Sequence, residues 1–331
     1  MSENKTTAPA LSREEKALAK ANAKQAKKLA RNRTRIQESF GDRVLLAFTT
    51  IILLMVLIIV GYPVLYVISS SFSSNKALNA GRVILFPVDV SLASYKFVFQ
   101  YTVVWDGFKM TVFYTVVGVI ITMLMQILCA YPLSKRNYQG RGLLMMVFFV
   151  TTMIGAGMIP TLLLRSAMGL RNNVWAVILA GIMSVHNMII LRTCFRSTIP
   201  GELYDAAAID GANDFQTLFQ IAFPLAKATL SVLTLYSAVG NWNEYFTSMI
   251  YLPNRPDLWP LQLVLRPIMM ASKTLQVDGG AVTSDMMLAA ESGTEGVVFA
   301  LIVITTVPVL LMYFVVQKYF EKGVMVGSVK G

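Results

Sequence analysis

Long stretches without a charged side chain dominate the hydrophobic pattern of this chain. Five of them contain at least 20 residues free of Asp, Glu, Lys and Arg, and an α-helix needs about 20 apolar residues to cross a bilayer. A sixth stretch, apolar and aromatic, is interrupted by Glu244 alone. The pattern predicts six membrane-spanning helices, at 44–75, 110–134, 142–164, 172–191, 229–249 and 296–317.

The composition points to the same class of protein. Hydrophobic residues make up 55% of the chain and charged residues 14%, whereas soluble domains contain about 25% charged residues. We therefore expect an all-α integral membrane protein, with a basic tail at 1–43 and a six-helix transmembrane domain at 44–331. Within the third helix, Gly155, Gly157 and Pro160 allow a kink.

Basic residues are distributed unevenly around the predicted helices. Residues 1–43 carry 11 basic and 5 acidic side chains, and the connection after the second helix carries Lys135, Arg136 and Arg141 without an acid. The loop 251–295 carries three basic and five acidic side chains. Because cytoplasmic connections hold the excess of Lys and Arg, we expect both termini and the loop 197–228 in the cytoplasm, and the loop 251–295 outside.

Two interpretations of the basic tail remain open. A helix over 11–40 would gather five apolar side chains on one stripe, which would lie on anionic headgroups: Leu11, Leu18, Leu29, Ile36 and Phe40. The stripe also contains polar residues, so the alternative is a solvated tail that only enforces orientation. The tail lacks the interleaved aromatic residues of a nucleic-acid module, so no nucleic-acid partner is expected.

Motifs of several other protein classes are missing from the sequence. It contains neither a Gly-x-x-x-x-Gly-Lys-Ser/Thr nucleotide site nor a nucleophile elbow, so we expect no cofactor bound by this chain and no catalytic residue. The single histidine, His186, excludes a metal site that needs two. The first apolar stretch has no cleavage pattern of a signal peptide. Cys129 and Cys194 lie in or beside predicted helices and are expected to be reduced thiols.

The loop 197–228 begins with the local signals of a short helix. Pro200 suits the first turn, where its missing N–H costs nothing. Glu202 and Asp205 place negative charge near the positive end of the helix dipole. Alanines at 206–208 favour the helix and let this face approach another protein closely. Gly211 fits the helix stop, because glycine adopts the left-handed conformation without strain.

A second short helix is expected directly after that stop. Asn213 can cap it, with Gln216 three residues further on in a capping-box relation. Pro224 is expected to end this helix, and Lys227 to mark the return to the membrane. The loop therefore reads as a helix, a sharp turn and a second helix.

The same loop resembles the cytoplasmic signature of ABC-importer permeases. That signature is a spaced set of an acid, two alanines, a glycine, an isoleucine and a proline, here Asp205, Ala206, Ala207, Gly211, Ile221 and Pro224. The sequence Asn-Trp-Asn-Glu-Tyr at 241–245 and the ending Gly-Ser-Val-Lys-Gly at 327–331 are similar to the carbohydrate-uptake (maltose and oligosaccharide) subgroup. The resemblance covers 44–331. This chain departs from the family pattern at Asp205, where Glu is usual, and at Phe223, where Leu is usual.

The resemblance implies a mechanism and a set of partners. The fold would be the type I ABC importer permease architecture, and the loop around Glu202 and Asp205 would dock in a cleft of a separate ATPase. Closure of the ATPase dimer on ATP would then switch the helices between inward- and outward-facing states. The implied partners are a second homologous permease, two ATPase subunits that hold ATP and Mg, and an extracytoplasmic solute-binding protein, in a bacterial plasma membrane. The end 323–331 either reaches the ATPase dimer or stays unattached.

Candidate residues for the substrate path lie in the predicted helices. Glu244 is the one acid inside a predicted span, and ionisable groups within a membrane often mark a transport path. Its neighbours Asn241, Trp242 and Asn243 suit the hydrogen bonding and ring stacking of a polyhydroxylated substrate. The alternative for Glu244 is helix packing or contact with interfacial water, and the same two interpretations apply to Asn187 in the fourth helix.

We expect the cargo to be an oligosaccharide or a related carbohydrate. The loop 251–295, with an amphipathic helix expected at 261–275, is the candidate docking surface for the solute-binding protein. One alternative is an importer of another polar solute, such as glycerol phosphate or a polyamine. A self-sufficient channel or a membrane enzyme is the alternative from another class.

Overall fold

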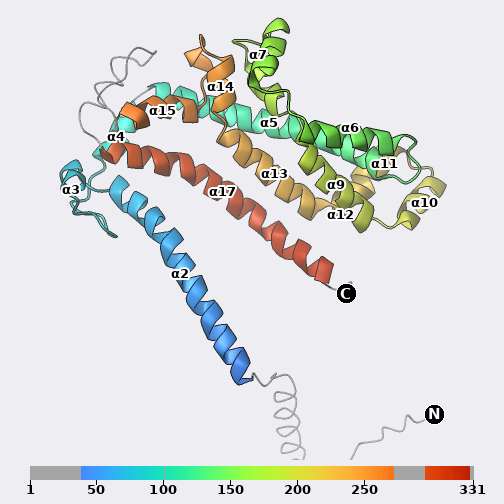
Figure 1. Ribbon diagram of the computed structural model, residues 1–331, viewed down its shortest axis with the longest axis horizontal. Helices are drawn as coiled ribbons and strands as arrows, with labels where there is room; N and C mark the ends of the chain where they lie inside the picture. Colours follow the sequence, from blue (N-terminus) through green and yellow to red (C-terminus); the bar gives the residue numbers. More distant parts are fainter. Residues whose placement is uncertain (1–38, 101, 272–294, 329–331) are drawn as a thin grey trace, which may run out of the picture. The chain divides into compact units, whose positions relative to one another are not determined.

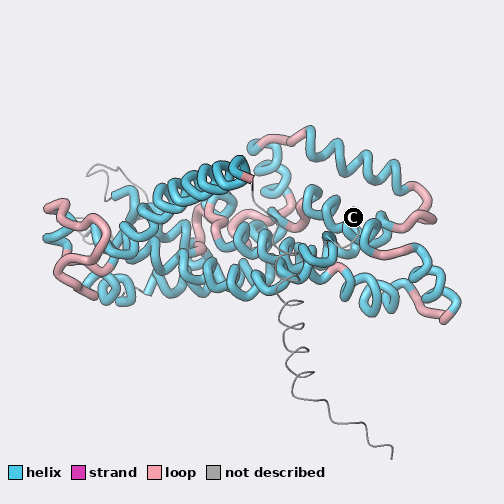
Figure 2. Tube along the Cα trace, turned by 90° about the horizontal axis from the view of Figure 1, so that it is seen from below, coloured by secondary structure: helices cyan, strands magenta, loops and turns pink. Residues whose placement is uncertain are grey.

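The computed structural model describes residues 39–100, 102–271 and 295–328, and every described segment is helix or loop (Figure 2). The helices before the loop 197–228 are α2 (Phe40–Ser71), α3 (Asn75–Asn79), α4 (Ala93–Gln100), α5 (Thr102–Ser134), α6 (Arg141–Met153), α7 (Met158–Ala167), α8 (Val174–Ile178), η1 (Leu179–Gly181) and α9 (Val185–Thr198). The later helices are α10 (Gly201–Ile209), α11 (Asp214–Thr217), η2 (Leu218–Ala222), α12 (Phe223–Leu225), α13 (Lys227–Trp242), α14 (Phe246–Tyr251), η3 (Pro256–Leu258), α15 (Leu261–Ala271) and α17 (Glu295–Ser328).

The chain divides into two compact units, Met1–Pro63 and Val64–Gly331. The described part of the first unit is the beginning of α2, whose apolar side chains are exposed on every side of the helix. A helix that is apolar all round is typical of a membrane span. The first predicted span is therefore confirmed as one helix, while the helix expected at 11–40 lies almost entirely outside the described residues.

Helix α5 is the centre of the second unit, and it packs against α9, α13 and α15 (Figure 1). Its buried face is a row of small and polar side chains three or four residues apart: Gly107, Thr111, Thr115, Gly118, Thr122, Gln126, Ala130 and Ser134. Small residues in such a row let neighbouring helices approach closely in a membrane. The second predicted span is confirmed and begins earlier than expected, at Thr102.

The third predicted span is not one continuous helix. Helices α6 and α7 meet at an angle of 115°, and residues 154–157 between them are not helical. Gly157 has a φ of +77°, which glycine adopts without the steric cost that other residues meet. The kink that the glycines allow is therefore present, but it is large enough to break the predicted helix in two.

The fourth and fifth predicted spans are also broken. In the fourth, α8 and η1 are bent by 46° against α9, and the Ser184 hydroxyl accepts a hydrogen bond from the Asn187 N–H to cap α9. In the fifth, α13 ends at Trp242 and α14 begins at Phe246. The fifth span, expected at 229–249, therefore consists of two helical segments, and residues 243–245 around Glu244 leave the helix between them.

The sixth predicted span is confirmed within α17. Its first residues approach α3 and α4 so closely that a Cβ on Gly296 would lie 2.5 Å from Ser94 Oγ and 2.7 Å from Asn75 Oδ1. In the preceding connection, α15 falls within the helix expected at 261–275, and residues 272–294 lie outside the described part of the chain. By length and composition the described helices give three continuous spans, or six if each of three bent pairs is one span: α6 with α7, α8 and η1 with α9, and the run Asp214–Leu225 with α13.

Candidate functional site

The first helix of the loop 197–228 forms as its sequence predicts. Pro200 precedes α10 as its N-cap, one position before the expected first turn. At the other end Gly211 has a φ of +73°. The Gly211 N–H donates to the Ala208 carbonyl and the Ala212 N–H to the Ala207 carbonyl, at 3.2 Å and 2.9 Å. These are the two hydrogen bonds of a Schellman motif, which satisfies the last carbonyls of the helix.

The second helix begins with the expected capping box. Asn213 Oδ1 accepts a hydrogen bond from the Gln216 N–H, and Gln216 Oε1 accepts one from the Asn213 N–H, both at 2.8 Å. Helix α11 then passes into a π-helical turn, η2, and into α12. Pro224 does not itself end the run, which continues to Leu225. The chain then bends by 85° into α13.

The loop exposes the residues that carry the resemblance. Glu202, Asp205, Ala206, Gly211 and Pro224 are exposed, while Ala207 is buried and Ile221 is half-buried. Large apolar side chains are exposed beside them: Leu203, Ile209, Phe215 and Phe219. Ile209 alone is 87% exposed. The loop thus presents a mixed surface of acids and apolar side chains, which is typical of a surface that another protein covers.

A cation at the end of α5 holds this loop to the membrane helices. Lys135 forms an ion pair with Asp214 at the start of α11. Its ammonium lies 4.7 Å from the ring centre of Tyr131 and 5.6 Å from that of Tyr204. Burial lowers the pKa of Lys135, but the hydrogen bonds and charges of Asp214 and Tyr131 together outweigh burial, so the pKa lies above the ordinary lysine value. The sequence analysis used Lys135 for orientation only and missed this contact.

The buried cluster behind the loop joins it to α5, α9 and α13. The Tyr131 ring on α5 packs edge-on against Phe195 of α9, with ring centres 6.0 Å apart. The cluster comprises Met123, Ile127, Ala130, Tyr131, Leu133, Met188, Leu191, Phe195, Ile199, Leu218, Ala222, Ala226, Leu230 and Leu233. Close-packed interiors transmit displacement, so movement of the loop would be passed directly to three membrane helices.

A second region, further along the same helices, is a cavity of about 300 Å³. It lies between the break that separates η1 from α9 and the end of α13. Its lining is mostly polar or small: Thr122, Val177, Ala180, Gly181, Ser184, Asn187, Tyr236, Ser237, Gly240, Asn241, Glu244 and Thr247. Broken helices at a polar cavity are a recurring feature of transport paths through membranes.

The structure brings three of the five predicted path residues to this cavity. Asn187 stands in the first turn of α9. Asn241 on α13 donates through Nδ2 to the Ser237 carbonyl at 2.8 Å. Glu244 Oε1 accepts a hydrogen bond from the Thr247 N–H at 2.6 Å, which satisfies a free donor at the start of α14. Glu244 therefore has a structural role in addition to its place at the cavity.

The other two predicted residues lie elsewhere. Trp242 is 2% exposed; its indole N–H donates to the Thr305 carbonyl at 3.0 Å and its ring packs edge-on against Phe108. Asn243 Nδ2 donates to the Val239 carbonyl at 3.0 Å, and this residue does not line the cavity. Trp242 thus fastens α13 to α5 and α17 rather than facing a solute.

The cavity also contains residues that the sequence analysis did not single out. Thr122, Ser184, Tyr236 and Ser237 contribute hydroxyl groups. Ser184 has the pattern of a helix N-cap, and Thr122 belongs to the small and polar row of α5, so both left a signal in the sequence. Together with the amides, these hydroxyls can donate and accept hydrogen bonds, as a polyhydroxylated solute requires. His186 is exposed, and the described residues contain no cluster of metal-binding side chains.

Known proteins provide a comparison for this arrangement. No protein-family model matches the sequence. The polygalacturonan/rhamnogalacturonan transport system permease protein YtcP of Bacillus subtilis is 37% identical over 279 residues, which is 84% of this chain and 96% of that protein. The diacetylchitobiose uptake system permease protein NgcG of Streptomyces coelicolor is 28% identical over 87% of this chain and 90% of its own length.

A solved structure agrees with these relatives. A bacterial ABC transporter involved in the import of the acidic polysaccharide alginate matches 86% of this chain and 100% of its own chain, with a TM-score of 0.77 and 34% identity. The chain belongs to the carbohydrate ABC transporter permeases, and the resemblance noted in the sequence is confirmed. It is a transport subunit and not an enzyme, with the type I ABC importer permease architecture.

Membership in this family also indicates the partners and the membrane location of the chain. The relatives are permease proteins of transport systems, so this chain works with a partner permease, an ATPase and a binding protein. The bacterial relatives and the long apolar helices make it a multi-pass protein of the bacterial inner membrane. The relatives give no support to a self-sufficient channel or a membrane enzyme.

Proposed function

We propose that this permease imports an oligosaccharide by alternating access, driven by an ATPase that docks on the loop 197–228. The exposed loop surface carries the proposal. Its acids Glu202 and Asp205 stand beside the apolar side chains of Ile209 and Phe215, and all four are exposed. Exposed apolar patches with a polar rim mark surfaces for protein binding.

The packing behind the loop supports its role as a coupling element. The Tyr204 ring of α10 lies 6.4 Å from that of Tyr131 on α5, and Lys135 pairs with Asp214, so both short helices are fixed to the membrane bundle. A rigid connection is needed because ATP-driven closure can act only on elements that move as a unit. Asp205 keeps the negative charge usual at its position, one methylene shorter.

The cavity between the broken helices is the proposed contribution of this chain to the substrate path. Asn187, Asn241 and Glu244 meet there with several hydroxyl groups, and such groups match the hydroxyls of a sugar. At about 300 Å³ the cavity is at the small end of ligand sites. We infer that the partner permease completes the path.

The same proposal includes the composition and the orientation of the transporter. The assembled transporter contains this chain, one homologous partner permease, two ATPase subunits that bind ATP and Mg, and a solute-binding protein. Both termini and the loop 197–228 face the cytoplasm, in agreement with the excess of basic residues. The loop 251–295 faces outwards and docks the solute-binding protein, and the tail 1–43 precedes the transmembrane domain 44–331.

The test is a pair of glycine substitutions with equal backbone strain. Gly211 and Gly169 both have positive φ, at +73° and +71°, and both have open space around them. Gly211→Asp should abolish ATP-dependent uptake of labelled oligogalacturonide and maltooligosaccharide and prevent ATPase co-purification. Gly169→Asp should keep the co-purification. Equal loss in both variants, or normal uptake and ATPase binding in Gly211→Asp at normal membrane levels, would refute the docking role.

A further inference from the structure

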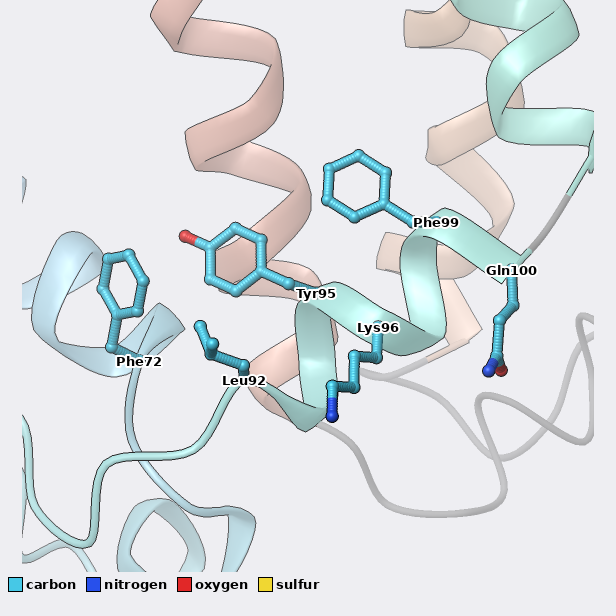
Figure 3. Close-up of a pocket in the computed structure, with 6 residues that line it drawn as sticks. All are labelled: Phe72, Leu92, Tyr95, Lys96, Phe99 and Gln100. Carbon is cyan, nitrogen blue, oxygen red and sulfur yellow. The ribbon is translucent and has the colours of Figure 1, made fainter.

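A groove of about 590 Å³ runs along helix α4, separate from the loop and from the cavity. Figure 3 shows two adjacent rows of side chains along this helix, Tyr95 with Phe99 and Lys96 with Gln100. Phe72 and Leu92 complete the lining. The groove is thus predominantly apolar, with one cation and one amide on one side of it.

Helix α4 lies where long apolar helices end. Tyr95 donates its hydroxyl hydrogen to Ser71 Oγ of α2 at 2.8 Å, and Gly296 at the beginning of α17 lies against Ser94. Helix α5 begins at Thr102, directly after α4. Because those three helices are long and apolar enough to span a membrane, a groove at their ends is expected at the depth of the lipid headgroups.

The aromatic residues around α4 fit this depth. The Phe99 ring stacks on Trp105, with ring centres 5.5 Å apart, and the Trp105 indole N–H donates to the Phe99 carbonyl at 3.1 Å. Tyrosine and tryptophan are enriched at the membrane interface, where one end of the ring system is apolar and the other is wet. The groove therefore faces the boundary between acyl chains and headgroups.

Lys96 supplies a positive charge at that boundary. Among the residues that the structure describes, it forms no ion pair with a carboxylate, and Asp106 of α5 pairs with Lys109 at 3.0 Å. The Tyr95 hydroxyl is already engaged with Ser71. Few polar groups remain for a sugar, whereas an apolar groove beside a free ammonium suits a ligand with an acyl chain and a phosphate.

We propose that this groove is a binding site for one phospholipid. Its phosphate lies on the Lys96 ammonium, and one acyl chain lies against Phe72, Leu92 and Phe99. The lipid would brace α4 where it joins the ends of α2, α5 and α17. This site is independent of the proposed cargo and of the ATPase loop.

The charge arm of the test uses two lysines of the same region. The full-length chain is purified with phosphatidylglycerol, and bound lipid is counted by native mass spectrometry. Lys96→Gln should lower the retained phosphatidylglycerol roughly fivefold, the effect expected for one basic residue at a membrane surface. Lys76→Gln, on an exposed lysine of α3 outside the groove, should retain as much as the wild type.

The lipid arm separates the phosphate from the acyl chain. Diacylglycerol with the same chains should be retained equally by the wild type and by Lys96→Gln, because it has no phosphate. Phe99→Ser should lower the retention of both lipids, whereas Phe86→Ser, at an exposed phenylalanine outside the groove, should lower neither.

Two outcomes would overturn the site. Equal phosphatidylglycerol retention in Lys96→Gln and Lys76→Gln would reject the phosphate contact. Capture of the solute-binding protein by a photoreactive side chain at position 96, with no lipid retained, would assign the groove to a protein partner instead.

Discussion

Gly118 on α5 lies directly against the side chain of Asn241 on α13. A Cβ added to Gly118 would stand 2.7 Å from Asn241 Oδ1 and 3.0 Å from its Cγ. The absence of a side chain at 118 therefore sets how closely the two helices approach, and it places the Asn241 amide at the cavity. This contact joins the central helix of the bundle to the proposed substrate path.

Gly118→Ala should displace Asn241 and separate the two helices. Overpacking of this kind costs about 1–3 kcal/mol, so we expect a lower thermal unfolding temperature in detergent and slower uptake. Gly142→Ala is the matched control, because nothing lies within 4 Å of a Cβ built there on α6. An unchanged unfolding temperature in Gly118→Ala would show that α13 can move aside without cost.

Breaking the ion pair between Lys135 and Asp214 should loosen the attachment of the loop 197–228 to α5. In Lys135→Ala and in Asp214→Asn, we expect ATP hydrolysis by the assembled transporter to continue while uptake per ATP falls. The reversed pair, Lys135→Asp with Asp214→Lys, should restore part of the uptake. Asp106→Asn is the control, because Asp106 pairs with Lys109 on the exposed surface at the other end of α5, where such pairs contribute about 0–1 kcal/mol.

The same ion pair has a defined dependence on pH. The pKa of Lys135 is raised in the folded chain, since the hydrogen bonds and charges of Asp214 and Tyr131 together outweigh the effect of burial. A group with a raised pKa contributes its full stabilisation below its unfolded-state pKa and loses it as pH rises through the folded value. Lys135→Ala should therefore lower the unfolding temperature by a constant amount from neutral pH to about pH 10. A difference that disappears within this range would contradict the pairing.

Substitutions at Asp205 test whether Asp can replace the usual Glu in docking the ATPase. Asp205→Asn removes the charge and should weaken ATPase co-purification, whereas Asp205→Glu keeps the charge, lengthens the reach and should preserve it. Asp210→Asn, at another exposed acid of the same loop, is the charge-matched control. If Asp205→Asn and Asp210→Asn bind the ATPase equally well, position 205 has no specific part in docking.

The cavity predicts a difference between two asparagines. Asn187→Ala removes an amide from the lining and should slow uptake of the transported oligosaccharide about tenfold, the effect of losing one to two kcal/mol of hydrogen bonding. Asn243 does not line the cavity, so Asn243→Ala should leave uptake near the wild-type rate. Equal rates in the two variants would remove Asn187 from the substrate path.

Local signals predicted the loop well because its conformation is determined by neighbouring residues. Gly211 acts through backbone hydrogen bonds, and Asn213 and Gln216 through bonds between side chain and backbone, all over three to five positions. Such local signals can be recognised in the sequence. The ion pair of Lys135 with Asp214 joins residues 79 positions apart. Such a pairing depends on how α5 and α11 pack, and hydrophobic pattern alone does not encode it.

Helix breaks were harder to predict, because they too depend on how distant segments pack. The length of an apolar stretch is the same whether the chain forms one straight helix or two helices bent by 115°, as α6 and α7 are. Trp242 was assigned to the substrate because aromatic rings suit sugars. Its contact with the Thr305 carbonyl becomes visible only when α13 is packed against α17.

The Schellman turn at Gly211 and the capping box at Asn213 determine the local conformation of the loop 197–228 through hydrogen bonds within residues 207–216. A segment whose turns form from its own residues can be exchanged between related permeases. Exchanging 200–224 for the corresponding segment of a relative should give a hybrid permease that accepts the relative's ATPase and keeps its own cargo. The choice of ATPase partner and the choice of cargo would then depend on separate segments of the chain.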